Sequence, residues 1–247
     1  MNKNRNVDPE RLDIALVRRG LVETRERARQ LIKTGSVQIR GQISTKPALK
    51  VHEDDSILLL EQLRYVGRGG LKLEAALNHF PVNVNGITAL DVGASTGGFT
   101  DCLLQHGASS VYAVDVGHNQ LSRKILGDPR VKVFENTDIR KLERLPQPVD
   151  LAVIDVSFIS LRLVLPVVIG FLKPTGRIIA LIKPQFEAGP HCVKKKGVIK
   201  NQSIREETVQ ELLQWIEAQG WTVLGLIPSP ILGGEGNTEY LAYLTPH

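Results

Sequence analysis

Charged residues that could carry out chemistry stand beside apolar runs of this sequence. Asp155 and Lys183 each follow an apolar, β-branched run, and Lys72 lies in a glycine-containing segment, residues 68–74. Most lysines are solvated surface charges, but Lys183 also precedes Pro184, so we expect its stem to be buried where a cleft begins. A lysine placed in this way could take a proton from a hydroxyl group. These residues are therefore candidates for proton transfer.

A glycine-rich loop, residues 90–100, connects an apolar run to a helical pattern. Its glycines allow a ligand to approach the backbone closely. Ser95 occupies the position where a dinucleotide fingerprint needs its second glycine, which disfavours NAD. Asp91 suits S-adenosylmethionine, because a carboxylate just before the first glycine can reach the methionine amino group. The expected loop ligands are Asp91, Gly93, Ala94, Ser95, Gly97, Gly98 and Phe99.

Acidic residues also end the next two apolar runs. Asp115 comes 24 residues after Asp91, where a carboxylate can accept both ribose hydroxyls of an adenosine. Asp138 is expected to meet the adenine edge, and Asp155 to contribute to the same site. Each acid alone could be an ordinary strand-end residue. Three acids at consecutive strand ends beside a glycine loop favour a nucleoside ligand.

The region from residue 88 onward alternates between strand and helix patterns. This alternation predicts an α/β, Rossmann-like, seven-stranded sheet, mostly parallel, covered on both faces, with its cleft at the carboxyl ends of the strands. The last two runs resemble the antiparallel edge pair of a methyltransferase sheet. The expected strands are 88–93, 110–117, 131–135, 150–158, 177–183, 223–227 and 240–244.

The net charge of +5 is unevenly distributed along the chain. Residues 1–50 hold 12 Lys/Arg against 5 Asp/Glu, and the remainder holds 19 against 21. Within this basic block, residues 11–20 and 25–35 are expected to form two short helices, the second capped by Thr24. Arg25, Arg29 and Lys33 recur every fourth residue and share one helix face. A basic face of this kind attracts phosphates.

The N-terminal segment resembles a known RNA-binding module. Short strands at 37–39 and 56–60 follow the two helices, and the stretch from Arg11 to Val37 resembles the αL module of a small-subunit ribosomal protein, tyrosyl-tRNA synthetases and pseudouridine synthases. The resemblance covers about fifty residues and implies a small α+β domain over residues 1–62. Such a module would position an RNA helix through phosphate contacts.

Composition limits the remaining possibilities. The longest apolar run, Leu163 to Leu172, is too short to cross a bilayer, and no leader-like segment is expected at the start. Cys102 and Cys192 fit neither a disulfide framework nor a zinc spacing. We therefore expect a cytoplasmic protein with no membrane partner and no metal.

Five segments in order extend the resemblance over nearly the whole chain: residues 68–74, 91–101, 155–160, 183–187 and 236–240. They are similar to the TlyA family of FtsJ-like ribose methyltransferases. The resemblance implies a catalytic tetrad at Lys72, Asp155, Lys183 and Glu239, with Lys183 as base. It also implies ribosomal RNA or ribosomal subunits as substrate, methylated at a cytidine ribose.

The resemblance also sets the expected boundaries: a linker at 63–67, centred on Arg64-Tyr65-Val66, and a methyltransferase domain at 68–247. Family members often carry Trp where this chain has Tyr65. RNA contacts are expected from both domains, at Arg18, Arg25, Arg29, Lys33, Arg68, Lys194, Lys195 and Lys196.

The residue types suit methylation of a hydroxyl. A ribose hydroxyl is a poor acid, so its methylation needs a base, a positive field for the forming alkoxide, and acids that orient the lysines. Lys183 would be the base and Lys72 would supply the field, while Asp155 and Glu239 would hold them.

Other functions remain open from sequence alone. An amino-group methyltransferase would usually carry Asn/Asp-Pro-Pro-Tyr/Phe after the fourth strand, and a C5-methylating enzyme needs a cysteine in the cleft, so both are disfavoured. The family's historical label, haemolysin, raises a membrane-active protein as an alternative. A catalytically inactive ribosome assembly factor is a third possibility.

Overall fold

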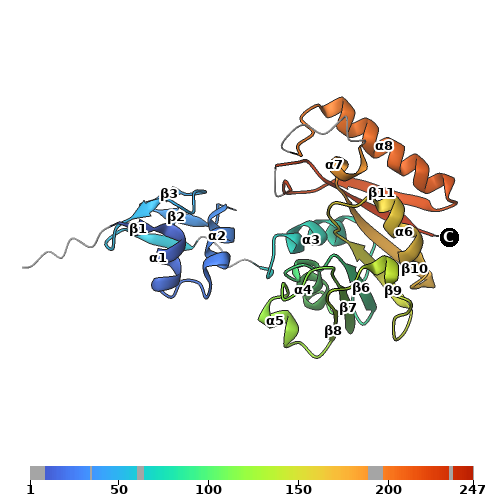
Figure 1. Ribbon diagram of the computed structural model, residues 1–247, viewed down its shortest axis with the longest axis horizontal. Helices are drawn as coiled ribbons and strands as arrows, with labels where there is room; N and C mark the ends of the chain where they lie inside the picture. Colours follow the sequence, from blue (N-terminus) through green and yellow to red (C-terminus); the bar gives the residue numbers. More distant parts are fainter. Residues whose placement is uncertain (1–8, 34, 60–63, 189–196, 234–235, 247) are drawn as a thin grey trace, which may run out of the picture. The chain divides into compact units, whose positions relative to one another are not determined.

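The computed structural model describes residues 9–33, 35–59, 64–188, 197–233 and 236–246. The chain forms two compact units, residues 1–64 and 65–247 (Figure 1). Tyr65 belongs to the second unit, where its side chain is 2% exposed in the core. The expected boundaries at residues 62 and 68 remain predictions, because residues 60–63 lie outside the described part of the chain.

The first unit is a small α+β domain, as predicted. Its helices are α1 (Leu12–Arg18) and α2 (Arg25–Lys33), and the Thr24 hydroxyl caps α2 by accepting a hydrogen bond from the Arg27 amide. Leu16, Leu31 and Ile32 pack between the helices and the strands. The strands are β1 (Glu10–Arg11), β2 (Val37–Ile39), β3 (Gln42–Ile43), β4 (Lys50–Val51) and β5 (Ile57–Leu59).

These strands form two small antiparallel sheets. The strand β2 lies between β3 and β5, and β1 pairs with β4. The strands β2 and β5 were predicted. The two-residue strands were not predicted, because they are too short to show an alternation of polar and apolar side chains.

The second unit is built on a seven-stranded sheet in the order β11-β12-β10-β9-β6-β7-β8. The strand β12 is antiparallel to both of its neighbours, and the other pairs are parallel. This confirms the mostly parallel sheet with an antiparallel edge pair. The bounds are β6 (Thr88–Val92), β7 (Ser110–Val114), β8 (Val131–Phe134), β9 (Val149–Ile154), β10 (Leu172–Ile182), β11 (Thr222–Pro228) and β12 (Tyr240–Thr245).

Helices cover both faces of this sheet. Because side chains alternate along a strand, Ala89 packs in the cluster that includes residues of α3 and α4, whereas Leu90 packs in the cluster with α6 and α8. The helices are α3 (Gly69–His79), α4 (Gly98–Gln105), α5 (Arg123–Leu126), α6 (Leu161–Ile169), α7 (Pro184–Glu187) and α8 (Gln202–Ala218), with a 3-10 turn at Ile139–Lys141.

The strand order reverses between β6 and β9. From β6 the chain moves outward to β7 and β8, and then returns to β9 on the other side of β6. Ligands of open α/β sheets bind at such a switch point, outside the carboxyl ends of the strands. In this unit the switch point lies between the loop after Val92 and the loop after Ile154.

The fourth strand of the sheet, β9, is shorter than predicted. We expected a strand over 150–158, but β9 ends at Ile154, and the backbone of Phe158 has a φ of 64°. A left-handed conformation cannot continue a strand. Residues 155–160 therefore form a loop at the switch point, and Asp155 begins it.

Candidate active site

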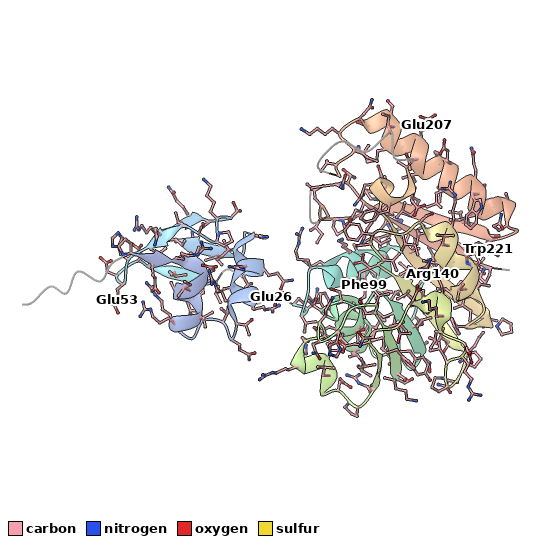
Figure 2. All side chains as sticks on the ribbon, in the orientation of Figure 1. Glu26, Glu53, Phe99, Arg140, Glu207 and Trp221 are labelled. Atoms are coloured by element: carbon pink, nitrogen blue, oxygen red, sulfur yellow. The ribbon has the colours of Figure 1, made fainter. Side chains whose placement is uncertain are left out.

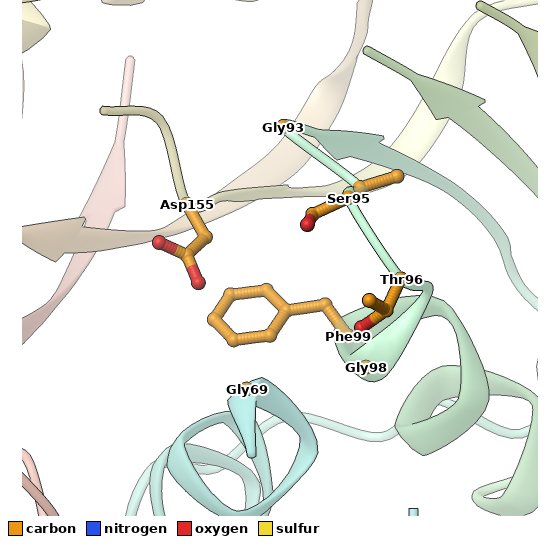
Figure 3. A pocket seen from close by; sticks show the side chains of 8 residues that line it. Gly69, Gly93, Ser95, Thr96, Gly98, Phe99 and Asp155 are labelled. Carbon is orange, nitrogen blue, oxygen red and sulfur yellow. The ribbon is translucent and has the colours of Figure 1, made fainter. Parts of the chain in front are cut away.

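A pocket with a cavity volume of about 100 Å³ lies at the switch point. Its lining comes from the loop after β6, the N-termini of α3 and α4, and the loop after β9. In Figure 3 the Asp155 carboxylate and the Phe99 ring project into the space between the 93–96 loop and Gly69. The lining residues are Gly69, Gly93, Ala94, Ser95, Thr96, Gly98, Phe99 and Asp155.

Glycine is required at the mouth of this loop. Gly93 has a φ of 86°, which side chains rarely adopt, and a Cβ there would lie 2.5 Å from the Asp155 carbonyl oxygen. The loop after β6 thus passes directly against the loop after β9. At Gly93 this close approach leaves only backbone facing a ligand in the pocket.

Asp91 lies beneath the loop and is completely buried. Its Oδ2 atom accepts a hydrogen bond of 2.6 Å from the Thr100 hydroxyl, and no hydrogen-bond partner of Oδ1 is found in the described residues. Burial raises the pKa of this carboxyl to about 7. A buried acceptor without a partner costs free energy, so a cationic or N–H group of a ligand would fit this position.

The acid after β7 shapes the pocket loop. Asp115 accepts hydrogen bonds from the backbone amides of Ser95, at 2.7 Å, and Gly117, at 2.6 Å. Ser95 has a φ of 48°, so the carboxylate supports an unusual backbone conformation. Asp115 is thus connected to the pocket through Ser95, although its own side chain is not among those that line it.

The acid after β8 is engaged elsewhere. Asp138 accepts hydrogen bonds from the backbone amide and the guanidinium of Arg140, a residue labelled in Figure 2. Hydrogen bonds from this guanidinium lower the pKa of the Asp138 carboxyl. The expected contact of Asp138 with an adenine edge therefore remains a prediction, and a ligand would compete with Arg140 for the carboxylate.

The four residues of the expected tetrad form two ion pairs. The Nζ atom of Lys183 lies 2.6 Å from Oδ1 of Asp155, and Nζ of Lys72 lies 2.5 Å from Oε2 of Glu239. Neither lysine side chain is more than 10% exposed. Burying a lysine is costly unless it is paired, so these partners account for the position of both cations.

Strand register brings these residues to one edge of the sheet. Ile182 on β10 pairs with Tyr240 on the antiparallel β12, so Lys183 and Glu239 follow at the next position of that ladder. Parallel pairing of Ala180 with Ile154 places Asp155 at the same edge. Lys72 reaches this edge from α3, whose first residue, Gly69, lies near Asp155: a Cβ there would be 3.7 Å from its Oδ2.

Two residues of the loop after β9 were not anticipated as functional. The Lys183 ammonium donates a hydrogen bond of 2.8 Å to the Ser157 hydroxyl. Phe158 is 90% exposed and its ring lies 5.0 Å from that of Phe186. A bulky residue with positive φ is strained, and such strain often occurs at functional sites. This turn was not predicted, because the apolar run through Phe158 has the pattern of a longer strand.

In the first unit, three arginines converge on one buried carboxylate. Asp13 is completely buried, and it accepts hydrogen bonds from Nε of Arg25 and of Arg29, both at 2.9 Å, and a two-pronged pair from Arg11. The Arg11 guanidinium, with those of Arg29 and Arg25, holds the pKa of this carboxyl well below its ordinary value. Asp13 and Arg11 were not predicted as functional residues, because the cluster joins α1, the residue before it and α2.

The other expected RNA-binding residues differ in their surroundings. Lys33 is exposed at the end of α2. Arg18 lies 2.6 Å from Glu10 and 3.7 Å from Glu53, and Arg68 donates a hydrogen bond to the Leu232 carbonyl. The remaining expected residues, Lys194, Lys195 and Lys196, lie outside the described residues.

Within the described part of the chain, no helix has the length and the apolar composition of a membrane span. The described residues also contain no group of three or more His, Cys, Asp or Glu side chains that could hold a metal ion.

The fold and the pocket together define a methyltransferase domain of the S-adenosylmethionine-dependent class. Residues 65–245 match the FtsJ-like methyltransferase family, and residues 10–57 match the S4 domain. The chain therefore belongs to the FtsJ-like methyltransferases, in their TlyA branch. Membership of this class implies S-adenosylmethionine as cosubstrate, and the S4 match confirms the expected αL module.

Several known proteins are similar to the whole chain. YqxC of Bacillus subtilis is 47% identical over 95% of this chain and 85% of its own length. The 16S/23S rRNA (cytidine-2'-O)-methyltransferase TlyA of Mycobacterium tuberculosis is 42% identical over 95% of this chain and 89% of its own. A solved structure from Streptococcus thermophilus that carries a haemolysin name has a TM-score of 0.75 and 44% identity, covering 96% and 88% of the two chains.

Proposed function

We propose that this protein transfers a methyl group from S-adenosylmethionine to the 2'-hydroxyl of a cytidine in ribosomal RNA. The observation that carries the proposal is the pair of lysine–carboxylate contacts, Lys183–Asp155 and Lys72–Glu239, of which Asp155 lines the glycine-rich pocket. The name of the relative TlyA, an rRNA (cytidine-2'-O)-methyltransferase, supports the choice of substrate.

The pocket residues have the properties that the cofactor requires. The backbone at Gly93, Ala94 and Gly98 would face the methionine part. The buried Oδ1 atom of Asp91, which has no hydrogen-bond partner among the described residues, would accept a hydrogen bond from its ammonium group. Asp115, already held against the pocket loop, would accept the ribose hydroxyls of the adenosine. When bound, S-adenosylmethionine supplies an electrophilic methyl group on its sulfonium.

Proton removal falls to Lys183 in this proposal. In its uncharged form, the Lys183 amine would take the proton of the ribose 2'-hydroxyl, and Asp155 and Ser157 would hold that amine in place. General-base assistance of this kind contributes about 10²- to 10⁴-fold to a rate. The Lys72 ammonium would stabilise the developing alkoxide, since a fixed charge in a buried site acts strongly on a forming negative charge. Glu239 would keep Lys72 oriented.

The RNA would be held at two kinds of surface. The guanidiniums of Arg11, Arg25 and Arg29, arranged around Asp13, would bind phosphates of an RNA helix. Next to Lys183, the exposed Phe158 ring would stack on a base, because every base offers a face to an aromatic side chain. Ribosomal RNA as substrate is consistent with the expected cytoplasmic location.

Transfer of a labelled methyl group tests the proposal directly. Purified protein, labelled S-adenosylmethionine and ribosomal subunits from cells that lack the gene should give labelled RNA, and mapping of 2'-O-methylation should place the label on a cytidine ribose. A label on a base, or no label on any RNA, would overturn the proposal.

The same assay separates the alternatives. An inactive assembly factor would bind ribosomal subunits without transferring the label, and a membrane-active protein would release dye from lipid vesicles without needing S-adenosylmethionine. The lysine–carboxylate pairs favour the enzyme, because buried ion pairs often add no stability over apolar side chains of similar size, so fold stability alone does not require them.

A further inference from the structure

The loops that follow β9 and β10 carry the residues assigned to proton transfer. Lys183 and Asp155 form an ion pair between the two loops, and Lys183 also donates a hydrogen bond to Ser157. The Phe158 and Phe186 rings lie 5.0 Å apart. The relative position of these loops therefore sets the position of the expected base.

A third connection between the loops comes from Glu187, at the end of α7. Its side chain is 2% exposed. Oε2 accepts a hydrogen bond of 2.6 Å from the Ser160 hydroxyl, and Oε1 accepts one of 2.8 Å from the Leu161 amide. Arg162 lies 3.8 Å away. Both carboxylate oxygens are thus bound to the point where the loop after β9 enters α6.

We propose that Glu187 is a positioning residue for methyl transfer, which clamps the Asp155–Ser160 loop to the Lys183–Glu187 segment that follows β10. The inference rests on the proposed function and adds to it a residue outside the expected tetrad. Glu187 touches neither Lys183 nor Asp155 in any contact described above, so it would act through the loop.

Two features explain why the loop needs a clamp. The positive φ of Phe158 is an unfavourable conformation, and such a conformation persists only when its surroundings hold it. The carboxylate also lies at the N-terminus of α6, where a negative charge interacts favourably with the positive end of the helix dipole. Helix α6 packs in the core through Val164 and Leu165, so Glu187 ties the loop to a fixed element.

A carboxylate at the opposite end of the sheet provides a control. Asp150, near the start of β9, accepts hydrogen bonds from the Thr88 amide at 3.0 Å and the Lys173 ammonium at 2.7 Å. It connects neighbouring segments in the same way as Glu187, but at the amino ends of the strands. Its removal should lower stability without changing the active site.

The experiment compares Glu187→Ala, Glu187→Gln, Ser160→Ala and Asp150→Ala in the full-length protein. Three quantities are measured: the single-turnover rate of methyl transfer to ribosomal subunits, the Kd of S-adenosylmethionine by calorimetry, and the melting temperature. We expect Glu187→Ala to lower the rate at least about tenfold, since small displacements of reacting groups are costly, with Kd within twofold. Glu187→Gln, which keeps an acceptor for Leu161, should restore the rate to within about threefold of the original protein.

Three results would overturn the inference: a Glu187→Ala rate within twofold of the original protein, a parallel loss of cofactor affinity, or an equal loss of rate in Asp150→Ala. If Glu187→Ala does not fold, Ser160→Ala decides: a reduced rate at unchanged Kd supports the clamp, and an unchanged rate refutes it. Failure of the unmodified protein to methylate RNA would instead refute the proposed function.

Discussion

Two carboxylates in this protein have no solvent-exposed surface and yet differ in their hydrogen-bond partners and in the direction of their pKa shifts. Asp13, in the first unit, accepts hydrogen bonds from three guanidiniums, and its pKa lies well below the ordinary value. Asp91, beneath the pocket loop, has a threonine hydroxyl on one oxygen and no described partner on the other, and burial raises its pKa to about 7. The protein satisfies the first charge itself and leaves the second incomplete.

This difference indicates how each region is used. Asp13 is saturated, so it arranges cations whose side chains remain 35–48% exposed and can face an external anion. Asp91 is unsaturated, so it suits a cation that a ligand brings. The tetrad is intermediate, because each buried lysine has one carboxylate. RNA docking would thus use a carboxylate that is surrounded by three cations, and cofactor binding a carboxylate without a cation among the described residues. Proton transfer would use lysines that each have one carboxylate.

The largest expected effect concerns the tetrad. Lys183→Ala should lower the methyl-transfer rate at least about 100-fold, because it removes the base, while the Kd of S-adenosylmethionine stays nearly unchanged. Lys173→Ala is a matched control, since Lys173 lies 2.7 Å from Asp150 at the other end of the sheet. Single-turnover rates and calorimetry measure the two effects. A Lys183→Ala rate above about a tenth of the original would remove Lys183 from this role.

The next effect concerns the arginines around Asp13. The slope of log affinity against log salt is negative. Replacing Arg25, Arg29 and Lys33 by Gln should make it less steep, by roughly 0.9 for each lost phosphate contact on a duplex. Three contacts would change affinity about 40-fold between 50 and 200 mM salt. Titration of ribosomal RNA at several salt concentrations measures the slope. Cofactor binding should stay constant, and replacing Lys194, Lys195 and Lys196 should add an independent effect.

An unchanged slope in the Arg25, Arg29 and Lys33 variant would mean that the first unit does not hold RNA phosphates. The buried Asp13 cluster would then be only a structural element, and the division of roles between Asp13 and Asp91 would fail.

A smaller effect follows from the pKa of Asp91. A ligand ammonium binds the charged carboxylate, so S-adenosylmethionine affinity should fall by up to about tenfold for each pH unit below 7 and level off above it. The pH dependence of folding stability, in the absence of cofactor, has the opposite sign to that of cofactor affinity. The folded protein keeps a proton that the unfolded chain releases, so this group's contribution to stability decreases as pH rises from about 4 to about 7.

Calorimetry between pH 5.5 and 8 tests the Asp91 prediction, with Asp91→Asn as the control that should be weak and flat. If the original protein binds S-adenosylmethionine with the same affinity at pH 5.5 and pH 8, the Oδ1 atom of Asp91 does not bind the cofactor.

Sequence patterns predicted the fold well where the structure is buried. The strands from β6 to β12 follow apolar runs, and each overlaps its expected range. The largest differences are that β9 ends four residues earlier and β10 begins five residues earlier than expected. The loop at Phe158 was not predictable in this way, since an exposed aromatic residue after an apolar strand has the same pattern as a longer strand.

The site was predictable by residue type and less so by contact. Acids and lysines at strand ends identified the edge of the sheet, but the pairing of Lys183 with Asp155 and of Lys72 with Glu239 depends on register and on the placement of α3. Asp13 could not be assigned from spacing, because its partners, Arg11, Arg25 and Arg29, are brought together only when the helices pack.

The smallest expected effect separates two arginines of the first unit. Arg25 shares one buried carboxylate with two other guanidiniums, so that cluster keeps a net positive charge. Arg18 instead makes both of its short hydrogen bonds to Glu10, with Glu53 at 3.7 Å, so two carboxylates oppose one cation. Arg25→Gln should make the salt dependence of RNA affinity less steep by up to roughly 0.9, which changes affinity about threefold between 50 and 200 mM salt. Arg18→Gln should reduce the steepness by clearly less. Glu10→Gln should make the salt dependence of RNA affinity steeper, because it removes the carboxylate that pairs with Arg18. Equal slopes for Arg18→Gln and Arg25→Gln, in the same RNA titration, would mean that neighbouring carboxylates do not decide which arginines reach the phosphates.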